Sequence, residues 1–201
     1  SANTSRERTS SHNNLNSSLN ANRVTERWKT NLRLEGYYSD QTFDIDGDRV
    51  TSVRRDFGSS ALQVRSINDH WSIGARAGAS SSTYLNQRLS ASFAPALEYD
   101  VYPYEESTRR QLRVQYSAGV RHYQYNDTTV YFKTQETRPT ESLNLAFEQK
   151  QTWGSLDARV NGYHFLDDLG KSRLTFSGGA SVRVVQGLSV NFSGNYSIIH
   201  D

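Results

Sequence analysis

Cysteine is absent from the 201-residue chain, which excludes disulfide frameworks, thiolate zinc sites and cysteine nucleophiles. Long apolar runs are also absent: no stretch approaches the roughly 18 consecutive apolar residues that a membrane-spanning helix needs. Proline is scarce, with three residues in the whole chain. Apolar residues make up only 35% of the sequence and the mean hydropathy is -0.75. Both values are low for a soluble globular protein, in which about half of the residues are usually apolar.

Disorder and a barrel with a polar lining are two explanations of this low apolar content. Disorder is disfavoured because the chain contains 12 Tyr, 8 Phe and 3 Trp. A barrel with a polar lining is favoured because one face of every strand then points into water. Charge is nearly balanced, with 23 basic and 21 acidic residues spread along the chain, so we expect no nucleic-acid partner.

The segment 110–125 carries the pattern on which the fold prediction rests. Its residues alternate between apolar and polar, as they do in a β-strand with one apolar and one polar face. The apolar set is Leu112, Val114, Tyr116, Ala118 and Val120, and the polar set is Arg113, Gln115, Ser117, Gly119 and Arg121.

Similar alternation recurs along the chain between turn sequences, and no segment has a helical period. We therefore predict one all-β domain over residues 1–201, an antiparallel up-and-down β-barrel (meander) of about ten strands, or about twelve if the chain is truncated at Asp201. Residues 1–12 are polar and predict a flexible N-terminal arm. The strand predicted over 50–66 is the least regular.

Alternation alone does not tell which face is enclosed. A soluble barrel fills its interior with large apolar residues, whereas an outer-membrane barrel turns them outward and has a polar interior. The polar face is rich in Ser, Gly, Asn and Gln with isolated charges between them, which favours the membrane barrel. We predict that these charges line the lumen and pair as an Arg–acid network. The members of this network are Arg33, Glu35, Arg76, Arg88, Glu98, Asp100, Arg113, Arg121, Glu148, Asp157, Arg159, Arg173 and Arg183.

Aromatic residues gather near the predicted strand ends, as in the belts that membrane proteins place at the lipid–water boundaries. The three tryptophans each fall near the start of a strand, which predicts that they share one rim. The predicted aromatic girdle consists of Trp28, Tyr38, Trp71, Tyr99, Tyr123, Tyr125, Tyr163 and Tyr196. Connections near 39–49, 126–139 and 165–172 are longer than the turns near 24–27, 67–70, 149–153 and 185–187, which favours short periplasmic turns and long outer loops. The 102–108 connection departs mildly from this alternation.

Three segments support a family resemblance. They are TERW at Thr25–Trp28, LRLEGYYS from Leu32, and LEYDVYPYEESTRRQLRVQYSAGVRHY from Leu97. In its general pattern of residues the chain resembles bacterial outer-membrane barrels, and in particular the YdiY-like salt-induced outer-membrane proteins, a family of unknown function. The resemblance implies a transmembrane β-barrel in the outer membrane of a Gram-negative bacterium. Its implied partners are outer-membrane lipid, the barrel-insertion machinery and a larger outer-membrane assembly. It brings no catalytic residues.

Candidate chemistry is sparse. The five histidines show none of the spacings of a metal site. His122 and His164 fall near strand ends on the apolar face and are interpreted as rim residues. A hydrolase would need a residue such as Ser117 or Asp157 beside a histidine, and the spacing does not indicate this. We therefore predict no enzyme, no cofactor and no metal.

The function predicted from the sequence is that of an outer-membrane β-barrel protein with a structural, stress-related or transport-accessory role. A lumen filled by paired side chains is preferred to a conducting pore, which would favour anions because cations outnumber acids on the polar face. Two alternatives stay open. One is a soluble β-barrel or β-sandwich that binds a ligand or partner, and the other is an outer-membrane enzyme that modifies lipids.

Overall fold

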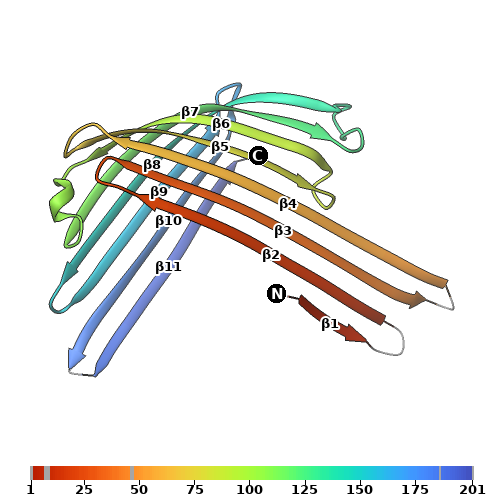
Figure 1. Cartoon of the computed structure of the whole chain (residues 1–201), viewed down its shortest axis with the longest axis horizontal. Coiled ribbons are helices and arrows are strands. Elements are labelled where there is room, and N and C mark those ends of the chain that lie inside the picture. Colours follow the sequence, from red (N-terminus) through yellow and green to blue (C-terminus); the bar gives the residue numbers. More distant parts are fainter. Residues whose placement is uncertain (1, 7–9, 46–47, 186, 201) are drawn as a thin grey trace.

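The computed structural model describes residues 2–6, 10–45, 48–185 and 187–200, which form a single antiparallel sheet. Its 11 strands follow one another in chain order, so each is hydrogen-bonded only to its sequence neighbours (Figure 1). This confirms the predicted all-β antiparallel meander. No helix among the described residues is long and apolar enough to cross a membrane. The strands are β1 (Ala2–Arg6), β2 (Ser10–Val24), β3 (Trp28–Ile45), β4 (Asp48–Ser66), β5 (Trp71–Ser82), β6 (Gln87–Asp100), β7 (Arg110–Tyr125), β8 (Gln135–Gln151), β9 (Gly154–Phe165), β10 (Asp168–Val185) and β11 (Leu188–His200).

Side-chain hydrogen bonds close two of the short turns. In the β2–β3 turn, the Trp28 backbone N–H donates to Thr25 Oγ1 over 3.1 Å. In the β4–β5 turn, the backbone N–H groups of His70 and Trp71 donate to Asn68 Oδ1 over 3.0 and 2.8 Å. Thr and Asn stabilise turns in this way because their short side chains reach the backbone two or three residues on. Both turns place a tryptophan at the first position of a strand, at the same end of the sheet.

The β6–β7 connection contains a short 3-10 helix, η1 (Tyr104–Glu106). Arg110 donates a hydrogen bond to the Glu106 carboxylate, and this bond lowers the pKa of Glu106 below its usual value. The guanidinium group of Arg110 also lies 4.4 Å from the ring centroid of Tyr102. These contacts attach the long connection to the start of β7.

The lengths of the connections differ from the prediction. The longest connections between described strands, 101–109 and 126–134, lie at opposite ends of β7, so long loops are not confined to one rim. The predicted loops 39–49 and 165–172 are mostly strand, because β3, β4 and β10 extend into them. Ladder hydrogen bonds use backbone groups alone, so a strand can continue after the apolar–polar alternation of its side chains has ended.

The described part of the predicted N-terminal arm is paired within the sheet. Residues 2–6 form β1 and residues 10–12 begin β2. The two strands pair from Ala2 opposite Leu15 to Arg6 opposite Ser11. A polar sequence without alternation can still form a strand when a neighbouring strand offers its backbone groups.

The register assigns the strand residues to two faces, because directly opposed residues of antiparallel strands point to the same side. On one face, Leu145 lies opposite Val114 and Val160. On the other, Asn144 lies opposite Gln115. We call these the apolar face and the polar face.

Strand β4 departs from this division. Leu62 lies opposite Arg76, and both Leu62 and Val64 belong to the polar face. Arg65 lies on the apolar face opposite Trp28, and its guanidinium is 5.4 Å from the Trp28 ring centroid. The cation–π contact allows a charged side chain to sit beside an aromatic ring on this face.

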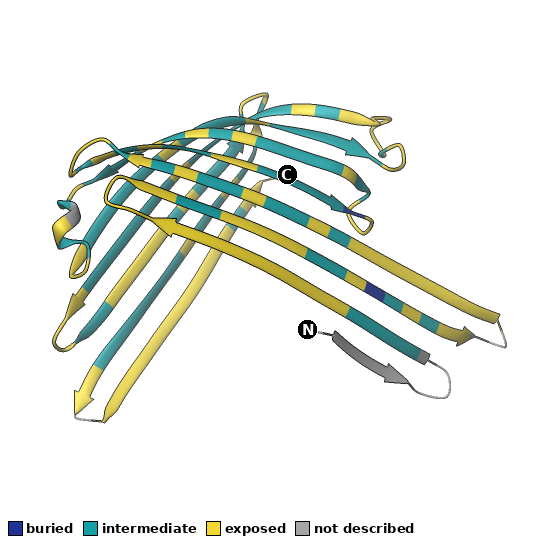
Figure 2. Cartoon of the chain, in the orientation of Figure 1, coloured by how far each residue is buried: buried dark blue, intermediate teal, exposed yellow. Residues whose placement is uncertain are grey.

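The described residues form one sheet without a second layer or a hydrophobic core. Among the described residues no hydrophobic side chain is buried, and the two buried residues are Ser39 and Ser82 (Figure 2). Leu32, Phe93 and Val120, all on the apolar face, are each about half exposed. The chain exposes 14491 Å², against about 9,600 Å² for a compact monomer of 22.8 kDa. The apolar face therefore lacks any protein layer to cover it.

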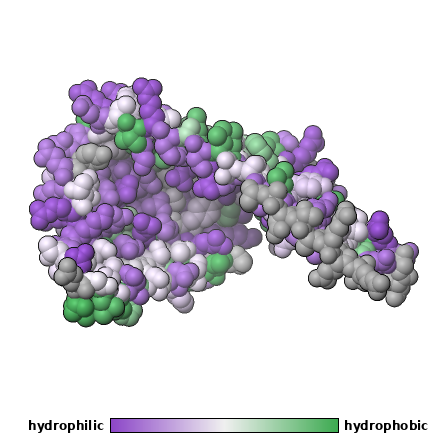
Figure 3. Space-filling model, turned by 60° about the horizontal axis from the view of Figure 1, so that its bottom comes forward, coloured by the Kyte–Doolittle hydropathy of each residue, from purple (hydrophilic) through white to green (hydrophobic). Residues whose placement is uncertain are grey.

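The sheet curves, and its polar face lines the hollow. Arg76 on β5 and Tyr163 on β9 line the same hollow although three strands separate β5 from β9. Two strands so far apart can share a hollow only on the concave side. Figure 3 shows this hollow with mostly hydrophilic side chains around it. The curvature is that of a barrel wall, but β2 and β11 are not hydrogen-bonded to each other, so the described sheet is open.

Candidate functional site

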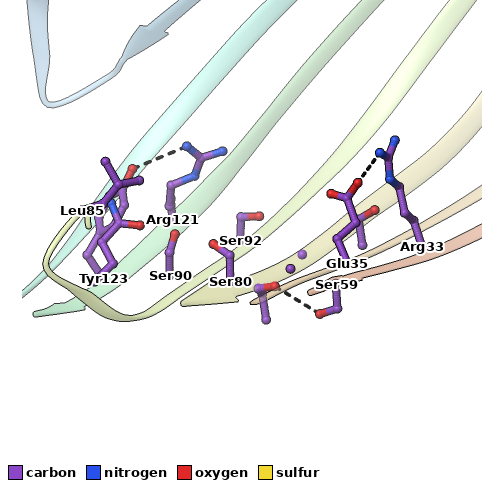
Figure 4. Close-up of a pocket in the computed structure, with 14 residues that line it drawn as sticks. Arg33, Glu35, Ser59, Ser80, Leu85, Ser90, Ser92, Arg121 and Tyr123 are labelled. Carbon is purple, nitrogen blue, oxygen red and sulfur yellow. Dashed lines mark hydrogen bonds and ion pairs between the residues drawn. The ribbon is translucent and has the colours of Figure 1, made fainter. Parts of the chain in front are cut away.

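The candidate binding site is a hollow of about 340 Å³ on the polar face over strands β3–β7 (Figure 4). Its size falls within the usual range for small-molecule sites. Two adjacent rows of directly opposed residues form it. The first row is Arg33, Ser60, Gly78, Ser92 and Arg121, and the second is Glu35, Gly58, Ser80, Ser90 and Tyr123.

Small residues keep the floor of this hollow low. A Cβ atom at Gly78 would lie 3.2 Å from Ser92 Oγ and 3.4 Å from the Ser59 carbonyl oxygen, so a larger residue would crowd the floor. The serine hydroxyl groups can donate as well as accept hydrogen bonds. The floor therefore offers hydroxyl groups between two arginines that come from opposite ends of the row.

The two arginines have different surroundings. Arg33 is paired with Glu35 of the same strand. Arg121 Nη1 donates to the Tyr123 hydroxyl over 3.4 Å, and no carboxylate of the described residues forms an ion pair with Arg121. Its guanidinium therefore keeps donors free for an anion, which arginine can bind through two parallel hydrogen bonds.

The predicted charge network shares one face but does not form one network. The register assigns every member to the polar face except Arg88, which lies at a bulge between Gln87 and Leu89. Contacts join some members into separate pairs. These pairs are Arg33–Glu35, Arg113–Glu98 at 3.7 Å and Arg159–Glu148 at 3.3 Å. Within the described part of the chain, the members without an ion pair are Arg76, Arg88, Arg121, Arg173, Arg183, Asp100 and Asp157.

The sequence prediction missed several ion pairs at this face. Arg54 on β4 pairs with Asp56 at 2.6 Å, and Arg138 on β8 pairs with Asp167 at 3.0 Å. Arg138 lies directly opposite Arg121. Arg138 falls within the predicted connection 126–139, although its alternation with the rest of β8 assigns it to the polar face.

The predicted aromatic girdle is divided between the two faces. Tyr123, Tyr125 and Tyr163 lie on the polar face, so they are not part of a belt on the apolar face. The Tyr123 and Tyr125 rings stack with centroids 6.1 Å apart, and the Tyr125 hydroxyl donates to Glu136 over 2.5 Å. The members on the apolar face are Trp28, Tyr38, Trp71, Tyr99 and Tyr196.

The residues considered for catalysis or metal binding are not assembled on the polar face. Ser117 Oγ lies 2.7 Å from Ser142 Oγ, and no histidine contacts it within the described residues. Asp157 lies against Gly179. No group of three His, Asp or Glu side chains in residues 2–6, 10–45, 48–185 and 187–200 is arranged to hold a metal ion.

Comparisons with known proteins do not add to this description. No protein-family model, no curated protein and no solved structure matches the chain. The likeness to YdiY-like proteins therefore stays a prediction, and function has to be argued from the two faces of the sheet.

Proposed function

We propose that the chain forms the wall of a bacterial outer-membrane β-barrel, with the apolar face toward lipid and the polar face toward the lumen. The observation that carries this proposal is the apolar face without a protein layer, on a sheet whose described residues bury no hydrophobic side chain. Apolar surface of this extent is unfavourable in water. Lipid would cover the apolar face without requiring that a second layer of protein be ordered against it.

The direction of curvature supports the same proposal. A soluble barrel has its large apolar residues on the concave side, whereas here the concave side carries Arg, Ser, Asn and Gln. A soluble β-sandwich would need a second sheet against the apolar face. The soluble alternative is therefore the weaker one.

The strand count is compatible with closure. Strands β2–β11 are ten long strands in a meander, so the first and the last run antiparallel. Bacterial single-chain barrels have an even number of antiparallel strands for this reason. We propose that β11 pairs with residues 17–24 of β2, beyond the segment that lies opposite β1, when the barrel is in a membrane.

The role that we propose is transport-accessory. Four polar-face arginines of the predicted network have no ion pair among the described residues, against two acids, Asp100 and Asp157, so the lumen would have an excess of positive charge. These arginines are Arg76, Arg121, Arg173 and Arg183. Together with the hydroxyl-lined hollow beside Arg121, this charge favours anionic solutes over cationic ones.

The proposal is tested by purification and gel migration. We expect the chain to require detergent for solubility and to fold in phospholipid vesicles, and the folded form to migrate faster on a gel before boiling than after it. A chain that is soluble and monodisperse without detergent, and that migrates identically with and without boiling, would contradict the membrane barrel.

A further inference from the structure

Three polar residues lie side by side on the apolar face, where they are unexpected. Glu141 on β8 lies directly opposite His164 on β9, and His164 lies directly opposite Ser172 on β10. The neighbouring row of the same face contains Leu143 and Leu174. Ionisable groups on a lipid-facing surface are costly, and they usually mark a functional site.

Hydrogen bonds hold two of these residues in place. Glu141 Oε1 lies 3.1 Å from His164 Nε2, and the Tyr116 hydroxyl donates to Glu141 Oε2 over 2.6 Å. Both carboxylate oxygens are therefore engaged, and the imidazole ring is oriented by an acid. Among the described residues nothing hydrogen-bonds to His164 Nδ1, which leaves this nitrogen available as a base.

Ser172 is within reach of that base. Directly opposed residues of antiparallel strands have Cβ atoms about 5 Å apart, so a rotation about the Ser172 χ1 angle can bring its Oγ toward the ring. The ladder between β9 and β10 is irregular between Asp168 and Ser172, so Ser172 is the first regularly paired residue after the irregularity. Hydrogen bonds of a catalytic site often form fully only when substrate is bound.

An apolar groove leads to the three residues. Gly162 separates Leu143 from Leu174 in the adjacent row, and a Cβ atom there would have no neighbour closer than 3.8 Å. The missing side chain opens a hollow that Tyr116, Leu143 and Leu174 line and that reaches His164 and Ser172. A hydrocarbon chain fits the apolar walls, and its polar end would lie at Ser172.

We propose that Ser172, His164 and Glu141 form a serine esterase site that acts on acyl esters of membrane lipids. The inference goes beyond the barrel wall and rests on the proposed membrane location for its substrate. Its three residues are 23 and 8 positions apart along the chain, a spacing that has no meaning until the strands are paired.

The chemistry balances with water as the co-substrate. Ser172 Oγ attacks the ester carbonyl carbon while its proton moves to His164 Nδ1, and Glu141 stabilises the imidazolium. The ester C–O bond then breaks, and the leaving alcohol takes the proton from His164. Water attacks the acyl-serine and gives a proton to His164. The fatty acid leaves, and Ser172 Oγ recovers that proton.

The test combines covalent labelling with lipid hydrolysis on the full chain refolded in phosphatidylethanolamine vesicles. A fluorophosphonate probe should add once to wild type, by displacement of fluoride by Ser172 Oγ, and not to Ser172→Ala. Fatty-acid release should fall at least about 100-fold in Ser172→Ala and in His164→Gln, the usual effect of removing a nucleophile or a general base. Fatty-acid release should fall less in Glu141→Gln.

Two matched controls sharpen this test. His200 on β11 also lies opposite Ser172, but it forms no ion pair with the described residues, so His200→Gln should keep wild-type release. His122→Gln, which removes another apolar-face histidine, should do the same. Labelling that persists in Ser172→Ala overturns the proposal, as does a wild type that is neither labelled nor active. Equal losses in His164→Gln and His200→Gln also overturn it.

The same samples separate this inference from the proposed function. A protein that inserts and is heat-modifiable but is not labelled refutes the esterase site and leaves the barrel intact. A protein that hydrolyses a water-soluble butyrate ester through Ser172 but never inserts refutes the barrel and its lipid substrate.

Discussion

The guanidinium group of Arg121 donates to the Tyr123 hydroxyl over 3.4 Å and, within the described residues, forms no ion pair with a carboxylate, whereas Arg159 on the same face pairs with Glu148 at 3.3 Å. The two arginines thus differ in whether an acid already occupies their donors. This difference provides a matched pair of variants for the polar face.

The first prediction concerns anion binding beside Arg121. Inorganic phosphate should raise the temperature at which the wild-type barrel loses its fast gel migration, because a ligand that binds only the folded state stabilises it. Arg121→Gln should reduce this increase, and Arg159→Gln should keep it. The same increase in all three proteins would show that phosphate does not act through Arg121.

The second prediction compares the two faces at adjacent positions. Leu145→Arg places a charge on the apolar face and should lower the free energy of unfolding in vesicles by about 2–4 kcal/mol if the residue is near the bilayer midplane. Asn144→Arg adds the same side chain to the polar face and should cost clearly less. Urea titration in phospholipid vesicles measures both, and equal losses would contradict the assignment of the faces.

The third prediction concerns closure of the barrel. The chain has no cysteine, so cysteine pairs can be introduced without a background. Asn20→Cys on β2 is combined with one further cysteine at a polar-face position of β11. One of these double variants should form a disulfide, and the yield of this disulfide should be higher in vesicles than without them. These β11 positions are Asn191, Ser193, Asn195 and Ser197.

The control for closure is Ser177→Cys with Asn195→Cys, because these residues are already directly opposed on β10 and β11. Disulfide formation needs Cβ atoms within about 4.5 Å, which opposed strand residues approach. A cross-link in the control and in none of the β2–β11 pairs would show that these strands do not meet.

The fourth prediction concerns pH and the β9–β10 turn. A hydrogen bond from Arg138 lowers the pKa of Asp167 below its usual value. A carboxyl group with a lowered pKa in the folded state stabilises that state above the unfolded pKa of about 3.9, and the stabilisation is lost as the pH falls through the folded value. The unfolding temperature of wild type should therefore fall more than that of Asp167→Asn between pH 5 and pH 3. Parallel curves would contradict this assignment.

Much of the sheet could be predicted from the sequence because alternation reports a strand directly. The strands around Leu112 and Leu145 were recognisable from their own residues. Strand β4 was predicted over 50–66, but its polar face could not be assigned, because the alternation of Leu62 and Val64 indicates two faces but does not say which of them is polar. That assignment depends on the partner residues, and the register with β3 and β5 puts both side chains beside polar neighbours.

The candidate sites were less predictable for the same reason. Glu141, His164 and Ser172 come together only because β8, β9 and β10 pair in one particular register. A shift of one residue would move each of them to the opposite face. Sequence spacing indicated His164 on the apolar face, but it gave no sign of the acid on one side of it or of the hydroxyl on the other.

The nearest-neighbour order of the strands has a kinetic consequence. Every strand pair of the described sheet joins segments adjacent in the chain, so the sheet can grow hairpin by hairpin with small loop-closure entropy at each step. Only the proposed contact between β2 and β11 would join distant segments. We therefore expect that membrane insertion ends with one slow step, the closing of this seam, and that it sets the overall folding rate.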